Sequence, residues 1–130
     1  MLRIVIATAI AAGLPLIGIA APATGNAPEP AAAAQPPAFA QCKACHSVDP
    51  AGKSGIGPNL YGIAGKVAGA KPDYSYSPAM KAARKKWDRA GLDAFIKDPK
   101  AVVPGTKMMA PPVADAQKRK QIVDYLLALN

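Results

Sequence analysis

The chain has 130 residues, of which 51% are hydrophobic and 18% charged, and its formal net charge is +8 at pH 7. This length and composition predict one small domain and exclude a chain that is disordered throughout. With one His and two Cys, the chain cannot supply a zinc site of four Cys, or of two Cys and two His, or a disulfide-dense scaffold. Aromatic residues make up 5% of the chain, while Pro (14) and Gly (11) are abundant. A core of side chains alone would be thin, so we expect something else to fill part of the interior.

The N-terminal segment has the pattern of a secretory signal peptide. Arg3 precedes the uncharged stretch 4–23, which ends in the small residues Ala21-Pro22-Ala23. We predict a signal peptide over 1–23 and export to the periplasm. The alternative is an uncleaved anchor on the periplasmic face of the inner membrane, because the stretch is long enough to span a bilayer. Residues 24–36 are rich in Ala and Pro and predict a linker.

The remaining segment, 37–130, is the predicted globular domain. It begins with a short helix from Pro37 to Cys42, with Pro in the first turn. Residues 47–73 contain six glycines and no sustained hydrophobic period, which predicts a long functional loop. A short helix is then predicted from Pro78 to about Lys86, with Ser77 as its cap.

Helices also dominate the C-terminal part of the predicted domain. Residues 88–97 fit a helix that Pro99 ends, and residues 99–113 fit a loop because of their Pro and Gly breakers. The last helix can be capped by Asp115, and its apolar residues recur at helical spacing: Ile122, Tyr125, Leu126 and Leu129. No segment alternates with the period of a strand. The predicted fold class is therefore all-α, with short helices and long Gly/Pro loops.

Both Cys and the single His fall in Cys42-Lys43-Ala44-Cys45-His46, which is the C-x-x-C-H attachment signature of c-type haem. Two Cys at i and i+3 lie on one face of a helical turn, so both sulfurs can form thioethers with the vinyl groups of one porphyrin. His46 then projects toward the iron as the proximal ligand. The motif predicts one haem c, bound covalently through Cys42 and Cys45.

These residues have two alternative uses. A disulfide or redox dithiol is the alternative, although a redox C-x-x-C belongs near a βαβ pattern that this sequence lacks. A zinc site would have to take its fourth ligand from a carboxylate, because no further Cys or His exists. Haem explains the small number of aromatic residues as well, because a large apolar ring fills the interior.

The second axial position of the iron has several candidates. Met80, Met108 and Met109 can offer a thioether, and Lys, a backbone group, water or an exogenous ligand stay open. Met80 lies in a predicted helix, where packing in a core explains it equally well. Met108 and Met109 lie in a proline-stiffened loop. His/Met coordination raises the reduction potential and leaves no open position for substrate, which suits electron transfer.

Residues 37–130 resemble a class I c-type cytochrome of the mitochondrial and alphaproteobacterial soluble type. The resemblance covers almost the whole predicted domain, and its motifs stand in the family's order. They are Cys42-Lys43-Ala44-Cys45-His46, Gly57-Pro58-Asn59-Leu60, Gly65-Lys66-Val67-Ala68-Gly69, Tyr74-Ser75-Tyr76, Trp87 and Pro104-Gly105-Thr106-Lys107-Met108. This many motifs in register imply the cytochrome c fold, wrapped around one haem.

The resemblance also implies a role for individual residues. Met108 matches the distal sulfur ligand, so it is preferred to Met109 and forms the metal site with His46. The carbonyl of Pro58 matches the group that accepts a hydrogen bond from the proximal imidazole. Tyr76 and Trp87 match donors to a buried haem propionate, with core packing as the alternative. Asn59 and Thr106 match polar residues that surround the haem site in the family.

The chain departs from the family pattern at a few positions. Lys66 stands where many relatives have Arg, and Ala110 replaces an aromatic residue beside the haem edge. Phe95 and Met80 stand where Tyr and Asn are common, so we expect a less hydrated pocket on the Met108 side.

The excess of Lys and Arg fits either a solvated surface or a face that docks on acidic partners. Nucleic acid is not expected as a partner, since an exported chain without aromatic residues between its basic stretches does not fit nucleic-acid-binding proteins. By resemblance, Lys43, Lys100 and Lys107 would surround the exposed haem edge. They would steer the protein toward acidic surfaces of a cytochrome bc-type complex and of a terminal oxidase or reaction centre. The run 84–86 is expected to face solvent.

These observations predict a monomeric one-electron carrier between respiratory or photosynthetic membrane complexes, and not an enzyme. A peroxidatic or gas-binding protein with five-coordinate iron is the main rival, and a dithiol oxidoreductase is a weaker one.

Overall fold

The computed structural model describes residues 34–129. The predicted signal peptide, its alternative as an anchor and most of the predicted linker lie outside these residues. In the described range no helix is both long enough and apolar enough to pass through a membrane. The same range holds no strand, and its only β-type pairing is an isolated antiparallel bridge between Val67 and Lys86. The all-α prediction is therefore confirmed.

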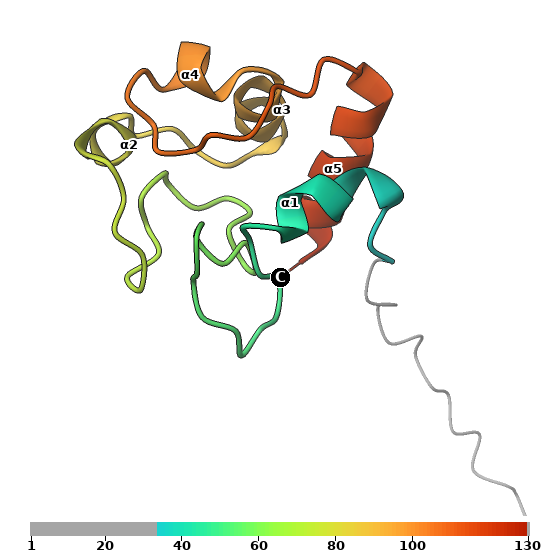
Figure 1. Ribbon diagram of the computed structural model, residues 1–130, viewed down its shortest axis with the longest axis horizontal. Helices are drawn as coiled ribbons and strands as arrows, with labels where there is room; N and C mark the ends of the chain where they lie inside the picture. Colours follow the sequence, from blue (N-terminus) through green and yellow to red (C-terminus); the bar gives the residue numbers. More distant parts are fainter. Residues whose placement is uncertain (1–33, 130) are drawn as a thin grey trace, which may run out of the picture.

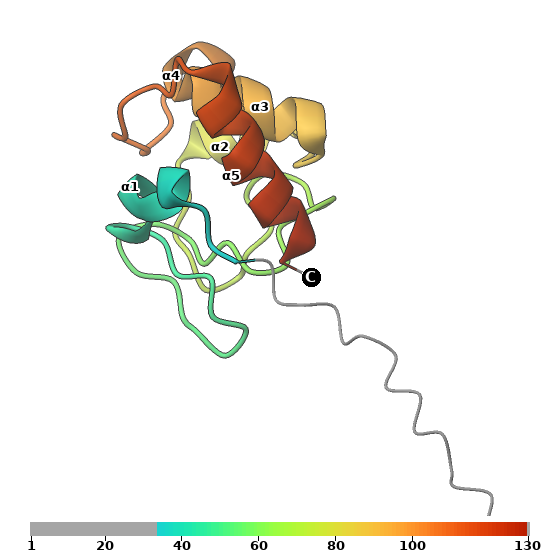
Figure 2. The same cartoon turned by 90° about the vertical axis from the view of Figure 1, so that its right-hand side faces the viewer.

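The helices are short and separated by long irregular segments (Figure 1). Two helical turns at the start of the domain are followed by the loop 47–73 and then by four more helices. Their bounds are η1 Pro37–Phe39, α1 Ala40–Lys43, α2 Pro78–Ala82, α3 Arg89–Lys97, α4 Pro99–Val102 and α5 Ala116–Ala128. Figures 1 and 2 show the helices on one side of the molecule and the green loop on the other.

Side-chain caps fix where the helices begin. Ser77 Oγ accepts from the Met80 amide at 3.1 Å, as predicted for α2. Asp115 Oδ1 accepts from the amides of Gln117 and Lys118 at 2.8 and 3.0 Å, as predicted for α5. These carboxylate and hydroxyl groups satisfy amides that have no partner inside the helix.

Two predicted boundaries were wrong. The helix expected to reach Lys86 ends at Ala82, and Arg84 then adopts a φ of 49°, a left-handed conformation that breaks the helix. The segment 99–113 was predicted to be all loop, but its start forms α4. Asp98 caps that helix by accepting from the Ala101 amide at 3.0 Å, and Pro99 supplies the fixed φ of a first helical residue.

The core consists of two apolar clusters. The larger one joins the start of the domain to α3 and α5, and the ring of Phe39 packs edge-on against Tyr125 with centroids 4.9 Å apart. The smaller one contains Ala68, Met80, Phe95 and Val103. Trp87 packs against both clusters.

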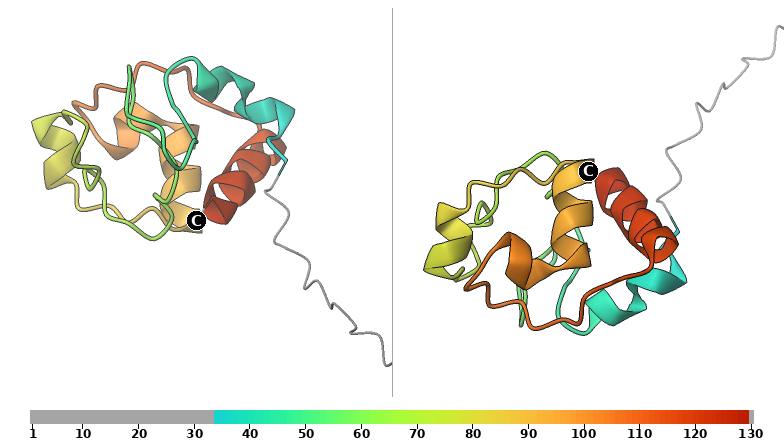
Figure 3. Two further views of the ribbon diagram at one scale, coloured as in Figure 1. Left: turned by 90° about the horizontal axis from the view of Figure 1, so that it is seen from below. Right: turned by 90° about the horizontal axis from the view of Figure 1, so that it is seen from above.

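Between these elements the chain follows a ring-like course. Figure 3 shows α2 and α5 at opposite ends, with α3 between them. The C-terminal end of α5 is fastened to the loop 47–73, because the Gly62 amide donates to the Leu129 carbonyl at 2.7 Å.

Candidate haem-binding site

Cys42, Cys45 and His46 lie on one continuous turn. The amides of Cys45 and His46 both donate to the Cys42 carbonyl, at 3.1 and 2.9 Å, so the chain keeps turning after α1 ends. Both cysteines are free; Cys42 is half-buried and Cys45 is exposed. Burial raises the pKa of the Cys42 thiol to about 11, and the neighbouring Cys45 adds to the rise. Cys42 is therefore a protonated thiol at neutral pH.

His46 is oriented by a carbonyl group from the long loop. Its Nδ1 lies 2.7 Å from the Pro58 carbonyl oxygen, and because a carbonyl can only accept, Nδ1 carries the proton. The lone pair is then on Nε2, which is the nitrogen available to a metal. Burial lowers the pKa of His46, although the hydrogen bond to Pro58 opposes this shift. The ring is thus neutral, as a metal ligand must be.

Gly57 provides the space in which this imidazole sits. Gly57 is buried, and its amide donates to the Cys45 carbonyl at 2.8 Å. A Cβ at this position would lie 2.5 Å from Cε1 and 2.7 Å from Nδ1 of His46. Only glycine permits the loop to pass so close to the ring.

Asn59 acts on the loop and not on the imidazole directly. Its amide group donates to the carbonyls of Asp49 and Gly52 at 2.9 and 2.7 Å, and its Oδ1 accepts from the Tyr61 amide at 2.8 Å. Both amide hydrogens are used within the loop. Asn59 therefore holds the loop that carries Gly57 and Pro58 in place.

The three candidate thioethers differ in solvent exposure, and that of Met108 is intermediate. Met80 is buried in the smaller cluster, and Met109 is 77% exposed. Met108 is half-buried and packs against that cluster, which includes Phe95. Its amide donates to Thr106 Oγ1 at 3.2 Å, so Thr106 helps to set the local backbone.

Tyr76 and Trp87 line one cavity of about 380 Å³. Burial raises the pKa of Tyr76, so its hydroxyl remains a donor at neutral pH. Trp87 also stacks at an angle on Phe95, with ring centroids 5.1 Å apart. The other lining residues include two cations and several apolar groups: Gly62, Ile63, Lys66, Val67, Ala70, Lys71 and Pro72.

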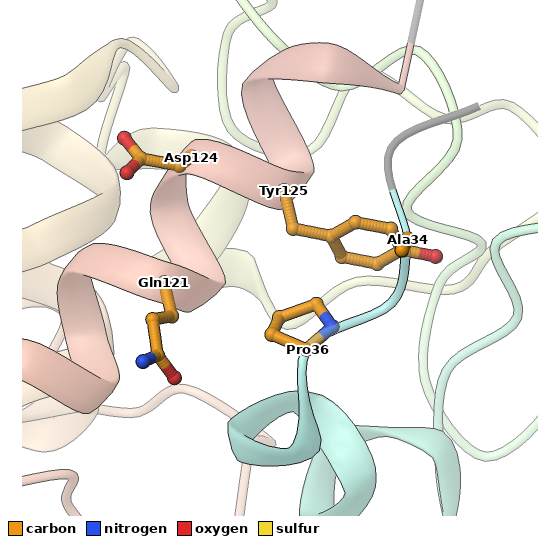
Figure 4. Close-up of a pocket in the computed structure, with 5 residues that line it drawn as sticks. All are labelled: Ala34, Pro36, Gln121, Asp124 and Tyr125. Atoms are coloured by element: carbon orange, nitrogen blue, oxygen red, sulfur yellow. The ribbon is translucent and has the colours of Figure 1, made fainter. Parts of the chain in front are cut away.

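The donor set fits a covalently bound haem. Two unpaired thiols stand on one turn, a neutral imidazole offers Nε2, and Gly57 leaves room for that ring. Within residues 34–129, no group of three or more His, Cys, Asp or Glu side chains is placed to hold a bare metal ion. A second pocket, of about 280 Å³, lies between the start of the described chain and α5 (Figure 4). None of the predicted site residues lines it.

Arg119 is not among the predicted site residues. This residue is buried on α5, its Nε donates to Asp93 Oδ1 at 2.9 Å, and its Nη1 donates to two backbone carbonyls near the end of the Met108 loop. The signal was present, because Arg119 precedes Ile122 by three residues and Val123 by four and so shares the apolar stripe of the helix.

Comparison with known proteins identifies the family of this chain. The Cytochrome c family profile matches residues 31–130. Cytochrome c2 of Rhodomicrobium vannielii is 44% identical over 88 residues, covering 68% of this chain and 70% of that protein. Cytochrome c2 iso-1 of Magnetospirillum molischianum is 52% identical over 77 residues, covering 59% and 76%. The solved structure of cytochrome cH from Methylobacterium extorquens superposes with a TM-score of 0.64 at 44% identity, over 68% of this chain and 89% of that one. This chain therefore belongs to the cytochrome c family and is a class I, monohaem c-type cytochrome, an electron carrier with one covalently attached haem c.

Proposed function

We propose that Cys42 and Cys45 form the thioether bonds to the haem, that His46 is the proximal ligand and that Met108 is the distal one. The state of His46 carries this proposal, because the hydrogen bond from Nδ1 to the Pro58 carbonyl leaves Nε2 unprotonated and available to coordinate a metal. When bound, the haem supplies a one-electron Fe(II)/Fe(III) couple. With both axial positions filled by side chains no site remains for a substrate, so the protein carries electrons and is not an enzyme.

The surrounding residues act on the ligands and on the charge of the haem carboxylates. The Pro58 carbonyl keeps the imidazole in the tautomer that coordinates and strengthens it as a donor. Tyr76 and Trp87, which share a cavity, would donate hydrogen bonds to a propionate and so stabilise its ionised form. Asn59 and Thr106 contribute through the backbone of the two ligand-bearing loops.

The test of the distal ligand compares Met108→Ala with Met109→Ala in the holoprotein. Loss of the ferric sulfur-to-iron charge-transfer absorption is expected in Met108→Ala, and the exposed Met109 provides the matched control, in which the absorption persists. Persistence of the absorption in Met108→Ala would contradict the assignment. Tight carbon monoxide binding by the native reduced protein would favour the five-coordinate rival instead.

We further propose that this carrier is a periplasmic monomer, which exchanges electrons with a cytochrome bc-type complex and with a terminal oxidase or reaction centre. The exposed cations Lys43 and Lys100 support docking on acidic surfaces of such partners, as does the net charge of the chain. Lys107 is exposed as well, but its Nζ donates to the Ser75 carbonyl at 2.9 Å, so part of its role is to fasten the loop.

The docking proposal is tested by the rate of electron transfer from a purified bc-type complex at increasing ionic strength. The rate should fall with salt, and Lys100→Gln should reduce the slope while Lys85→Gln, in the basic run 84–86, leaves it unchanged. A rate that does not depend on salt would contradict electrostatic steering.

Intact-mass measurement of the exported protein separates a cleaved signal peptide from a retained anchor, and it reports the added mass of the haem.

A further inference from the structure

Two ion pairs join α3 to α5, and they differ in burial. Arg89 Nη1 lies 2.6 Å from Asp124 Oδ1 at the surface, where the Arg89 side chain is 60% exposed. Arg119 Nε lies 2.9 Å from Asp93 Oδ1, and the Arg119 side chain is only 9% exposed. A surface pair contributes little to stability, whereas a buried guanidinium must have partners for its donors.

The partners of Arg119 extend beyond α3. Its Nη1 also donates to the carbonyls of Val113 and Ala114, at 2.9 and 2.7 Å. These two residues connect the loop that carries Met108 to the start of α5. The Val113 amide, in addition, donates to the Ile96 carbonyl at 3.1 Å. The C-terminal end of the Met108 loop is therefore fastened to both helices, and the guanidinium is the centre of that attachment.

The loop itself offers little other support after Met108. Within the described chain, residues 109–112 make no hydrogen bond, and Pro111 and Pro112 have no amide hydrogen to donate. Before Met108 the loop is held by the Thr106 amide, which donates to the Val103 carbonyl at 3.0 Å, and by Lys107. The position of the thioether thus depends on the attachments at the two ends of the loop.

We propose that Arg119 is a positioning residue for the distal ligand: by holding Val113 and Ala114 against α3 and α5, it limits how often Met108 leaves the iron. The inference rests on the proposed assignment of Met108. Without the guanidinium, the carbonyls at 113 and 114 can be hydrated, since Val113 is half-buried and Ala114 exposed. Loss of these hydrogen bonds should therefore let the loop detach, and it should affect the packing of the two helices less.

The experiment measures how fast imidazole replaces Met108 in the ferric holoprotein. At saturating imidazole the rate is limited by the departure of the thioether. Arg119→Ala should raise this limiting rate by about tenfold or more, as expected for loss of charge-assisted hydrogen bonds. Arg119→Lys keeps the charge, but one ammonium group cannot reproduce the fork of a guanidinium, so its rate should also rise. Asp93→Asn, which leaves the carbonyl contacts in place, should give a smaller increase.

The matched control is Arg89→Ala. It removes the other ion pair between the same two helices, and Arg89 makes no hydrogen bond or ion pair with the described residues of the Met108 loop. The limiting rate of Arg89→Ala should therefore change by less than about twofold. Unfolding in guanidinium chloride, followed by far-UV circular dichroism, identifies variants that lose global stability.

Limiting rates of Arg119→Ala and Arg119→Lys that match the wild type would overturn the inference, as would an equal increase in Arg89→Ala. If Arg119→Ala does not fold, Arg119→Lys and Asp93→Asn decide the question. A wild-type protein without the sulfur-to-iron absorption would show instead that the assignment of Met108 has failed.

Discussion

Gly57 and His46 approach each other so closely that a Cβ on Gly57 would lie 2.5 Å from Cε1 of the imidazole. Gly57→Ala should therefore displace the ring and weaken its hydrogen bond to Pro58. We expect a loss of about 1–3 kcal/mol in the free energy of unfolding, the usual cost of inserting a methyl group into a packed site. Denaturant unfolding of the holoprotein measures it.

Gly55→Ala is the control for this substitution. No atom lies within 4 Å of a Cβ at position 55, and the residue has no positive φ. Equal losses at the two positions would mean that the general cost of replacing a loop glycine, and not contact with the imidazole, explains the result.

Phe39 ties the first turn of the domain to α5. Its side chain is fully buried and its ring meets Tyr125 at a centroid distance of 4.9 Å. Phe39→Ala should lower the free energy of unfolding by about 3–5 kcal/mol, because it leaves a cavity in the larger cluster. Ile56→Ala removes an exposed side chain and should cost no more than about 0.5 kcal/mol. A loss at Phe39 as small as that at Ile56 would show that η1 contributes little to the core.

The raised pKa of Tyr76, which burial causes, predicts a difference in stability at alkaline pH. The folded protein holds the Tyr76 proton more tightly than the unfolded chain does. The resulting contribution to the free energy of unfolding is therefore fully present below the pKa of the unfolded state. It is lost as the pH rises from there through the folded pKa. Between pH 8 and pH 11, the unfolding midpoint of the wild type should fall more steeply than that of Tyr76→Phe, about 10 being the ordinary tyrosine pKa. Parallel pH curves would contradict this prediction.

Lys107 should affect stability as well as docking. Lys107→Ala removes the hydrogen bond to the Ser75 carbonyl and should cost about 1 kcal/mol in unfolding free energy. Lys100→Ala, at an exposed position of α4, should change it by less than about 0.5 kcal/mol. If both variants unfold alike, the contact of Lys107 with Ser75 is not stabilising. Because Lys107 also has this structural contact, Lys100 variants are the better choice for measuring the salt dependence of electron transfer.

Local chemistry made much of the site predictable. The spacing of Cys42 and Cys45 suits two thioether bonds to one porphyrin, and His46 follows them directly, so the motif predicts its own function. Ser77 and Asp115 were predicted as caps because a helix begins wherever such a side chain can accept from its first amides. The bond between His46 and Pro58 was expected only by resemblance to the family, since nothing in the composition of the loop brings position 58 to position 46.

The errors and omissions arose where tertiary contacts outweigh local signals. The end of α2 depends on the left-handed Arg84, a conformation that the sequence of a basic run does not indicate. The helix α4 was hidden in a segment rich in Pro and Gly, although Asp98-Pro99 is a typical helix start. Arg119 lies on the apolar stripe of α5, but the stripe does not indicate its three partners, which come from α3 and from the end of the Met108 loop.

The bond between the Gly62 amide and the Leu129 carbonyl has a practical consequence for anyone who expresses this protein. The last described residue is part of the fold and closes the ring that the chain follows. Deletions that remove Leu129 would release Gly62, in the loop 47–73, from the C-terminal end of α5. Affinity tags should accordingly be added after the final residue, with the native C-terminal sequence left intact.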